Sequence, residues 1–357
     1  MDWKPESWGW DEALEADFAA YRQLGYEPGR VTLEHKRLYR VVCAGGELLA
    51  EVSGKLMHQA GGRADYPAVG DWVALQPRLS DGRATIHGLV PRRSTFSRRA
   101  AGPAVEEQIV AANVDIVFLV HALNQDYNLR RLERYLTLAY ESGASPVIIL
   151  SKADLADDVE TRLAEVGTVA PGVPVHAVST LTGEGLEPLE SYLQPGRTAA
   201  LLGSSGAGKS TLVNRLYGSE VLRTGGIREG DDRGRHTTTH RELIRLPGGA
   251  LLIDTPGMRE LQLWDADSGL GTAFGDVEEL ALACRFGDCG HGSEPGCAVR
   301  AALEDGTLSS ARYQNYVKLQ KELAYEARKA DSSLARAEKE RLKSIHSSMR
   351  NQSKGLR

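Results

Sequence analysis

The segment Gly203–Thr211 has the composition of a loop that binds phosphate groups. It matches the P-loop pattern Gly-x4-Gly-Lys-Ser/Thr, in which glycines let backbone N–H groups face the phosphates. An apolar run precedes it and a predicted helix follows, and the N-terminus of that helix adds positive potential. We therefore expect Lys209 to reach the β- and γ-phosphates and Ser210 to bind Mg²⁺. The residues predicted to contact nucleotide here are Gly203, Ser204, Ser205, Gly206, Ala207, Gly208, Lys209, Ser210 and Thr211.

A second phosphate-side motif, Asp254-Thr255-Pro256-Gly257, follows the apolar run Ala250–Ile253. A buried strand over that run would place Asp254 at its carboxyl end, where ligands of α/β sheets bind. We expect Asp254 to hold Mg²⁺ through water and the Gly257 N–H to contact the γ-phosphate. Asp-x-x-Gly is also a common turn, so the weight of this motif comes from its position downstream of the P-loop.

Two further short motifs predict which base is bound. Asp154, in Ser151-Lys152-Ala153-Asp154, can accept hydrogen bonds from both N1–H and the N2 amine of guanine, which adenine cannot satisfy. Such a polar match can discriminate by roughly 10⁴-fold. The stem of Lys152 is expected to pack on the base plane, and backbone N–H groups of Ser179 and Thr180 are expected to contact guanine O6. Either motif alone is weak, but both follow predicted strands and together indicate guanine.

Three cysteines and one histidine lie within a stretch of fourteen residues, in the pattern Cys284-x4-Cys289-x-His291-x5-Cys297. Three thiolates and one imidazole are typical of a closed tetrahedral structural Zn²⁺ site. We expect a structural ion rather than a catalytic one, because no coordination position stays open. The competing interpretation is a set of unliganded surface cysteines. Cys43, on a predicted strand, is expected to be a core residue.

The elements that position these motifs follow from hydrophobic patterning. Near-continuous apolar runs alternate with helical patterns between residues 105 and 270, which predicts a parallel α/β sheet. The expected strands are Val114–Val120, Pro146–Leu150, Val173–Val178, Thr198–Leu202 and Ala250–Ile253, and the expected helices include Asn128–Ser142 and Lys209–Tyr217.

The chain upstream of this sheet is rich in short β patterns separated by Gly and Pro turns. Strands are expected at Arg37–Val42, Leu48–Ser53, Asp71–Gln76 and Ala84–Leu89, and they favour a five-stranded oligonucleotide-binding (OB) barrel. The predicted fold is therefore multidomain. Its expected parts are a leader with a helical pattern around Trp10–Leu24 (1–30), the OB-fold barrel (31–100), the α/β P-loop domain (105–270), a zinc-binding helical domain (275–334) and a basic tail (335–357).

The order of the motifs is unusual, because the base motifs precede the P-loop. The set is complete, so the domain is predicted to be a circularly permuted GTPase. The γ-phosphate motif Asp254–Gly257 then lies near the end of the domain and leads into the Cys/His region. A switch motion could pass along that connection.

Composition limits the class of protein. The net charge of −5 argues against a mainly electrostatic nucleic-acid binder, but the stretch from Ala335 to the end carries seven Lys/Arg against two Glu. No apolar run is long enough for a transmembrane helix, and the N-terminus does not resemble a signal or transit peptide. Four cysteines, three of them clustered, favour a metal site in a reducing cytoplasm. We expect a monomer that does not bind membranes.

The permuted order, the P-loop, Asp254–Gly257, the upstream barrel and the Cys/His spacing together resemble the ribosome small-subunit-dependent GTPase A (RsgA/YjeQ) family over about residues 35–350. The resemblance implies a GTPase, stimulated by the small ribosomal subunit and its rRNA, that acts late in maturation of that subunit. It implies one structural Zn²⁺ per chain and Mg²⁺ with GTP.

The segment Gly234–Thr239 resembles the first switch of this family. The resemblance implies that Thr238, or alternatively Thr237, senses Mg²⁺ and the γ-phosphate. Met258 follows Gly257 where many GTPases have a water-positioning Gln, so His236 is the candidate for that role. A mobile surface histidine is the competing interpretation. Ser151 stands where Asn is commoner, and we expect it to loosen the tie between the base motif and the P-loop.

Two other functions remain open at this point. A P-loop ATPase or small-molecule kinase would share the phosphate site, although Asp154 and Ser179 argue against it. An RNA-binding zinc scaffold that binds nucleotide with little turnover would share the barrel, metal module and tail, and Met258 fits it.

Overall fold

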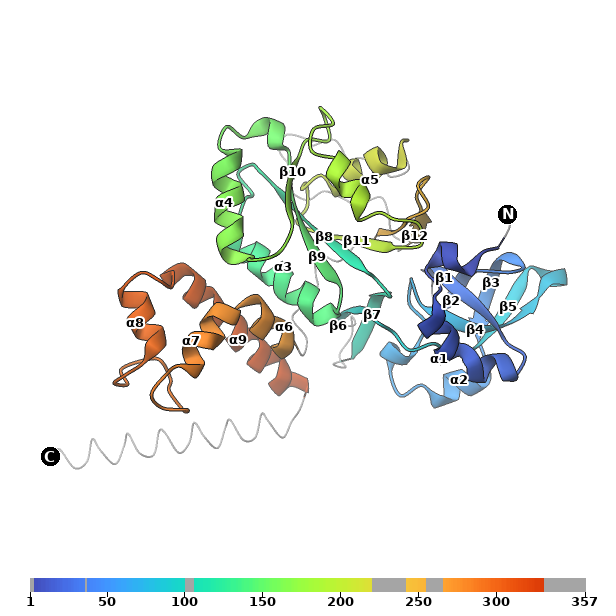
Figure 1. Cartoon of the computed structure of the whole chain (residues 1–357). Coiled ribbons are helices and arrows are strands. Elements are labelled where there is room, and N and C mark those ends of the chain that lie inside the picture. Colours follow the sequence, from blue (N-terminus) through green and yellow to red (C-terminus); the bar gives the residue numbers. More distant parts are fainter. Residues whose placement is uncertain (1–2, 36, 100–105, 220–241, 255–265, 331–357) are drawn as a thin grey trace, which may run out of the picture.

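The computed structural model describes residues 3–35, 37–99, 106–219, 242–254 and 266–330 (Figure 1). Within them the chain forms an N-terminal barrel, a central sheet with helices on both faces, and a group of helices toward the C-terminus. No helix in this part of the chain combines the length and apolar character needed to cross a membrane.

The N-terminal barrel has five strands and closes on itself. Strands pair in the order β1-β2-β3-β5-β4, and β4 returns to β1. The β3–β5 pair is parallel and the other pairs are antiparallel. Alternate residues of β2 and β3 point into the barrel core. The expected five-stranded barrel is confirmed, with strands β1 (Glu27–His35), β2 (Leu38–Cys43), β3 (Gly46–Val52), β4 (Trp72–Arg78) and β5 (Arg83–Leu89).

Strand β1 has no counterpart among the strands predicted from the sequence. We expected a leader up to residue 30, but β1 begins at Glu27 and includes Pro28 and Gly29, which disguise the strand pattern. A Cβ at Gly29 would lie 2.2 Å from Leu75 Cδ1, so the missing side chain leaves room for Leu75 of β4 in the barrel core. The leader also packs on the barrel, because Phe18 of helix α1 (Glu12–Gln23) shares a core cluster with Trp72.

The central sheet has five parallel strands and one antiparallel edge strand, in the order β10-β9-β8-β11-β13-β12. Helices α3 and α4 pack on one face and α5 on the other. The expected α/β architecture is confirmed, and β12 is an addition that sequence patterning missed. The elements are β8 (Ile116–Ala122), α3 (Leu129–Ser142), β9 (Ser145–Ser151), α4 (Val159–Val169), β10 (Val175–Val178), β11 (Thr198–Leu202), α5 (Lys209–Tyr217), β12 (Glu242–Arg245) and β13 (Leu251–Asp254).

The barrel and the central sheet meet where Leu33 of β1 pairs with Glu242 of β12. The buried guanidinium of Arg30 reinforces this junction. It donates to the Thr198 hydroxyl at 3.0 Å and to the Asn113 carbonyl at 3.2 Å. The first residue of the strand that carries the P-loop is thereby fixed to the barrel.

The C-terminal helices pack against α3 rather than standing apart (Figure 1). Their buried side chains belong to the same core cluster as one face of the central sheet. A Cβ at Gly269 would lie 2.4 Å from the Thr137 carbonyl oxygen, which shows how closely α6 approaches α3. These helices are α6 (Asp267–Ala273), α7 (Gly275–Leu282), α8 (Ala298–Glu304) and α9 (Ser310–Ala330). The remaining helix and hairpin are α2 (Gly54–Gln59), β6 (Thr95–Arg99) and β7 (Glu107–Ala112).

Candidate nucleotide site and metal centre

The described nucleotide motifs lie at, or directly after, the carboxyl ends of parallel strands in the central sheet. Ser179 follows β10, Lys152 follows β9 and the P-loop follows β11, while Asp254 is the last residue of β13. Val178 pairs with Ser151, and Ala200 pairs with Ile253, so the strand ends lie in step. The sheet therefore brings the base motifs and the phosphate motifs to one edge.

The P-loop has the backbone shape that its glycines predict. Gly206 and Gly208 have φ angles of +73° and +87°, where other residues are strained. A Cβ at Gly203 would lie 2.3 Å from the Val120 carbonyl oxygen, so the loop leaves β11 in close contact with β8. Lys209, at the start of α5, donates through Nζ to the carbonyls of Gly203 at 2.7 Å and Ser204 at 2.6 Å. Its ammonium group lies across the loop that would cradle phosphates.

Ser151 forms the tie between the base motif and the P-loop that we expected it to loosen. Its hydroxyl donates to the Ala207 carbonyl at 2.6 Å, with the His121 carbonyl oxygen 3.3 Å away. Because β9 and the P-loop approach closely, the short serine side chain is long enough to reach. Lys152 follows in the left-handed conformation, with φ of +59°.

The two base loops differ in how they are held. Asp154 lies in a short 3-10 helix (Ala153–Leu155) and its side chain is exposed. Ser179 is fully buried, and its hydroxyl accepts a hydrogen bond from the Thr182 N–H at 3.1 Å. Thr180 follows at the surface of the same turn and is half-buried. A fixed turn next to an accessible carboxylate is the arrangement needed for a base to enter from solvent.

Asp126 contacts the P-loop and Arg131 contacts Asp126, and neither residue was singled out from the sequence. One carboxylate oxygen of Asp126 accepts from the Ser204 hydroxyl at 2.5 Å and pairs with Arg131 at 2.7 Å. Burial opposes ionisation of Asp126, but Arg131 and Ser204 hold its pKa below the usual range. The only sequence signal is that His121 and Asp126 lie at and just after the end of an apolar strand.

His121 is buried within β8. Burial and, to a smaller extent, the charge of Arg131 lower the pKa of its imidazole to about 4. Among the described residues its Nε2 atom has no hydrogen-bond partner. The ring packs near Tyr135 of α3, with centroids 5.7 Å apart. A neutral imidazole therefore lies inside the sheet near the P-loop.

Several predicted residues lie outside the described part of the chain. These are His236, Thr237 and Thr238 of the first switch, Gly257 and Met258 of the γ-phosphate motif, and the basic tail. Of Asp254 only the backbone position, at the end of β13, is described.

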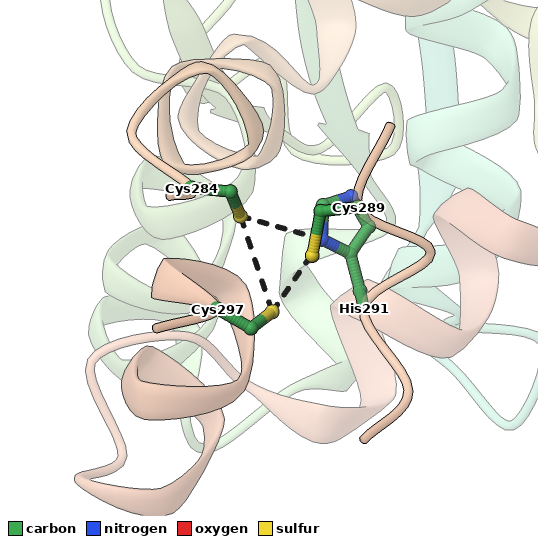
Figure 2. Close-up of side chains that lie close together, drawn as sticks. All are labelled: Cys284, Cys289, His291 and Cys297. Atoms are coloured by element: carbon green, nitrogen blue, oxygen red, sulfur yellow. Dashed lines mark hydrogen bonds between the residues drawn. The ribbon is translucent and has the colours of Figure 1, made fainter. Parts of the chain in front are cut away.

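The Cys/His motif forms a compact four-ligand cluster (Figure 2). One donor atom from each of the four side chains lies within 4.8 Å of the others. Cys284 Sγ is 3.5 Å from His291 Nδ1 and 3.9 Å from Cys297 Sγ, and Cys297 Sγ is 3.5 Å from the same nitrogen. Such a cluster can hold a metal ion.

The pKa values of the cysteines in this cluster explain why it would bind a cation. Desolvation opposes ionisation of Cys284, but N–H groups of Val299 and Ala298 at the start of α8 lower its pKa. A His291 N–H favours the Cys289 thiolate, yet desolvation and the neighbouring thiols raise the Cys289 pKa to about 11. Adjacent thiolates repel each other, and a divalent cation would remove that repulsion.

Comparison with known proteins identifies the family. Residues 89–264 match the RsgA GTPase family. The small ribosomal subunit biogenesis GTPase RsgA of Opitutus terrae is 50% identical over 353 residues, which cover 96% of each chain. The protein of the same name from Methanosarcina acetivorans is 45% identical and covers 94% of this chain and 90% of its own. This chain belongs to the RsgA GTPase family.

Solved structures agree with this RsgA assignment. The crystal structure of YjeQ from Thermotoga maritima superposes with a TM-score of 0.65 at 29% identity, covering 84% of this chain and 98% of that one. YloQ, described as a circularly permuted GTPase, gives 0.59 at 25% identity over 84% of this chain and 95% of its own. The predicted permuted GTPase fold is thus confirmed, and this RsgA-family chain is a GTP-hydrolysing enzyme.

Proposed function

We propose that this GTPase binds the small ribosomal subunit through its rRNA and acts late in maturation of that subunit, with GTP hydrolysis stimulated by the subunit. The main observation behind this proposal is that the P-loop and the accessible Asp154 lie at the same edge of one sheet. The chain is also 50% identical to a small ribosomal subunit biogenesis GTPase. The upstream barrel adds a fold that commonly binds oligonucleotides.

In the proposed nucleotide site, P-loop residues from Gly203 to Thr211 surround the phosphates and Lys209 contacts the β- and γ-phosphates. Ser210 and Asp254 hold Mg²⁺, which would neutralise charge that develops on the phosphates. Asp154 accepts the two guanine donors, Lys152 packs on the base, and the Ser179–Thr180 turn contacts O6. The support is topological, because the strands align the described motifs at one edge.

Hydrolysis itself is assigned to the switch regions. Thr238 is the proposed Mg²⁺ and γ-phosphate sensor and His236 the proposed water-positioning group, because Met258 cannot orient water. Without a Gln at that position, intrinsic turnover is expected to be slow, on the order of 10⁻³–10⁻² s⁻¹ or less. Subunit binding would then order the loop around His236 and Thr238.

The metal in the Cys/His cluster is proposed to be one structural Zn²⁺ per chain. Tetrahedral zinc with bonds of about 2.3 Å to sulfur and about 2.0–2.1 Å to nitrogen separates two sulfurs by about 3.8 Å, and sulfur from nitrogen by about 3.5 Å. The observed separations of 3.9 Å and 3.5 Å fit those values. Four free thiols in the chain also support action in a reducing cytoplasm.

The proposal is tested by GTP hydrolysis with and without purified small ribosomal subunits, using large subunits as the matched control. We expect turnover to rise many-fold with small subunits and to stay at the intrinsic rate with large ones. Equal rates under all three conditions would contradict the proposed function. In the same assay, His236→Ala is expected to lose the stimulated rate and keep GTP affinity. A variant that still responds fully would remove His236 from the mechanism.

A further inference from the structure

We propose that helix α3 passes the state of the P-loop to the Cys/His module, here meaning helices α6–α9 with the loop 284–297. Asp126 is the positioning residue at the P-loop end, and Glu133 with Arg312 forms the contact at the module end. This inference rests on the nucleotide site proposed above. It differs from transmission along the chain through residues 255–265, because it runs through side chains of another helix.

At the P-loop end, one carboxylate oxygen joins two elements. The Ser204 hydroxyl of the P-loop and the Arg131 guanidinium in the first turn of α3 both contact Asp126 Oδ2, at 2.5 Å and 2.7 Å. Asn128 caps the same helix, since its side chain accepts from the Arg131 N–H at 3.2 Å. The start of α3 is therefore tied to the loop that would hold the phosphates.

A bound phosphate chain would disturb this contact. Its negative charge would repel the Asp126 carboxylate and attract the Arg131 guanidinium, because this pair lies against the P-loop at Ser204. The P-loop with nucleotide and the P-loop without it therefore favour different positions of the Asp126–Arg131 pair. Because Arg131 belongs to α3, binding of nucleotide would change the position of the first turn of α3.

At the module end, a buried ion pair joins α3 to three other helices. Glu133 is 3% exposed, and its carboxylate accepts from Arg312 at 2.8 Å and from Asn315 at 2.6 Å, both on α9. Arg312 also makes two bonds of 2.7 Å to Asp276 on α7 and one of 2.9 Å to the Ala273 carbonyl on α6. One guanidinium thus fixes α6, α7 and α9 to α3.

Further contacts make the connection stiff. Arg134 pairs with Glu322 of α9 through two bonds of 2.7 Å, and Gly269 of α6 lies against the α3 backbone at Thr137. Arg131, Glu133 and Arg134 lie within one turn of the helix, so a shift at the P-loop end displaces the module contacts directly. Figure 1 shows α3 running between the central sheet and these helices.

Hydrogen–deuterium exchange of the full-length protein, with and without saturating GDP, tests the inference. In the unmutated protein we expect GDP to change exchange in α7, α9 and the loop 284–297 by about threefold or more. Asp126→Asn keeps a group that Ser204 can contact but loses the charge that phosphate repels, so the change at the module should disappear while GDP still binds. The matched control is Asp158→Asn, because Asp158 pairs with Arg162 on α4 and lies in a different ion pair.

A second variant covers the case in which Asp126→Asn fails to fold or to bind GDP. Arg312→Lys keeps the charge and loses the planar fork, so GDP should bind normally and the response in α7 should fall. A response equal to that of the unmutated protein in either variant would overturn the role of α3. Binding of GDP to unmutated protein without any change at the module would overturn it as well. Failure of the unmutated protein to bind GDP would instead contradict the proposed nucleotide site.

Discussion

At the carboxyl edge of the sheet, the P-loop extends from strand β11, whose five side chains are all buried without it. In the loop 284–297, by contrast, the four ligand side chains themselves fill the interior, and Cys297 both caps α8 and contacts the cluster. The sheet has a hydrophobic core that does not depend on bound nucleotide. In the loop 284–297, Cys297 is the one buried residue, and it belongs to the metal cluster. Removing a side chain that contacts nucleotide should therefore lower nucleotide affinity and leave the sheet folded. Removing a metal-binding side chain should unfold the loop 284–297.

The largest expected effect is at the loop. Cys289→Ser should remove the metal and unfold residues 284–297, because binding of a structural zinc ion contributes about 10–16 kcal/mol to small metal domains. GTP affinity should stay within about fivefold, since the sheet keeps its own core. Exchange mass spectrometry, metal analysis and nucleotide titration check this.

The matched control for that substitution is Cys43→Ser, which changes a buried free cysteine in the barrel. It should leave the metal content at one per chain. The comparison between the two sites would fail if Cys289→Ser abolished GTP binding. Purification without chelator that yields protein lacking zinc would refute the metal assignment.

Lys209→Ala tests the other half of the comparison. Hydrogen bonds to charged groups contribute about 1.5–3 kcal/mol each, so losing contacts to two phosphates should weaken GTP binding on the order of 10²-fold or more. The free protein should unfold at nearly the same temperature, because the sheet that carries the P-loop has its own buried hydrophobic core. Lys55→Ala, on α2 of the barrel region, is the control. A large drop in melting temperature for Lys209→Ala would mean that this site, too, is needed for folding.

A smaller effect concerns acid stability of the sheet. The pKa of His121 is lowered to about 4 by burial, so the unfolded chain, with a histidine pKa of about 6.5, binds the proton first as pH falls. Above about pH 6.5 this proton uptake does not affect the free energy of unfolding. By pH 5 it should have lowered that free energy by about 2 kcal/mol. His121→Gln should flatten the dependence of unfolding free energy on pH in this window. The control His58→Gln, at an exposed site on α2, should keep the original slope. An unchanged slope in His121→Gln would contradict the assignment.

The smallest expected effect is at the tail, outside the described residues. Truncation after Ala335 removes seven Lys/Arg and two Glu. Each phosphate contact made by a basic side chain steepens the salt dependence of binding, so the truncated protein should bind small subunits more weakly and with a flatter slope. Intrinsic GTP hydrolysis should not change. Identical affinities and slopes across a salt series would exclude the tail from docking.

Prediction from the sequence succeeded where local signals were sharp. The strand Thr198–Leu202 and the helix Lys209–Tyr217 have the expected bounds, because glycines mark the loop between them. Strand β1 was missed because Pro28 and Gly29 look like a turn, and only packing against Leu75 explains the glycine. Short β12 was missed because only Leu243 and Ile244 of its four residues are apolar, between Glu242 and Arg245.

Contacts between distant segments could not be predicted in the same way. The contact of Ser151 with the Ala207 carbonyl could not be predicted, because residue type does not give the distance between them, which the sheet sets. Asp126 and Arg131 likewise became candidates only when the structure showed Asp126 in contact with Ser204 and Arg131 in contact with Asp126. Sequence reasoning found motifs whose chemistry is local, and missed residues whose role comes from neighbours far away in the chain.

Subunit-stimulated nucleotide hydrolysis by Asp154→Asn is the most direct test of guanine recognition by a subunit-activated GTPase. Asparagine offers one donor and one acceptor in place of two acceptors, which matches xanthine rather than guanine, and such polar matches discriminate by roughly 10⁴-fold. We expect the variant to lose GTP turnover, to hydrolyse XTP, and to do so faster with small ribosomal subunits. A variant that keeps subunit-stimulated GTP hydrolysis and does not use XTP would contradict the account.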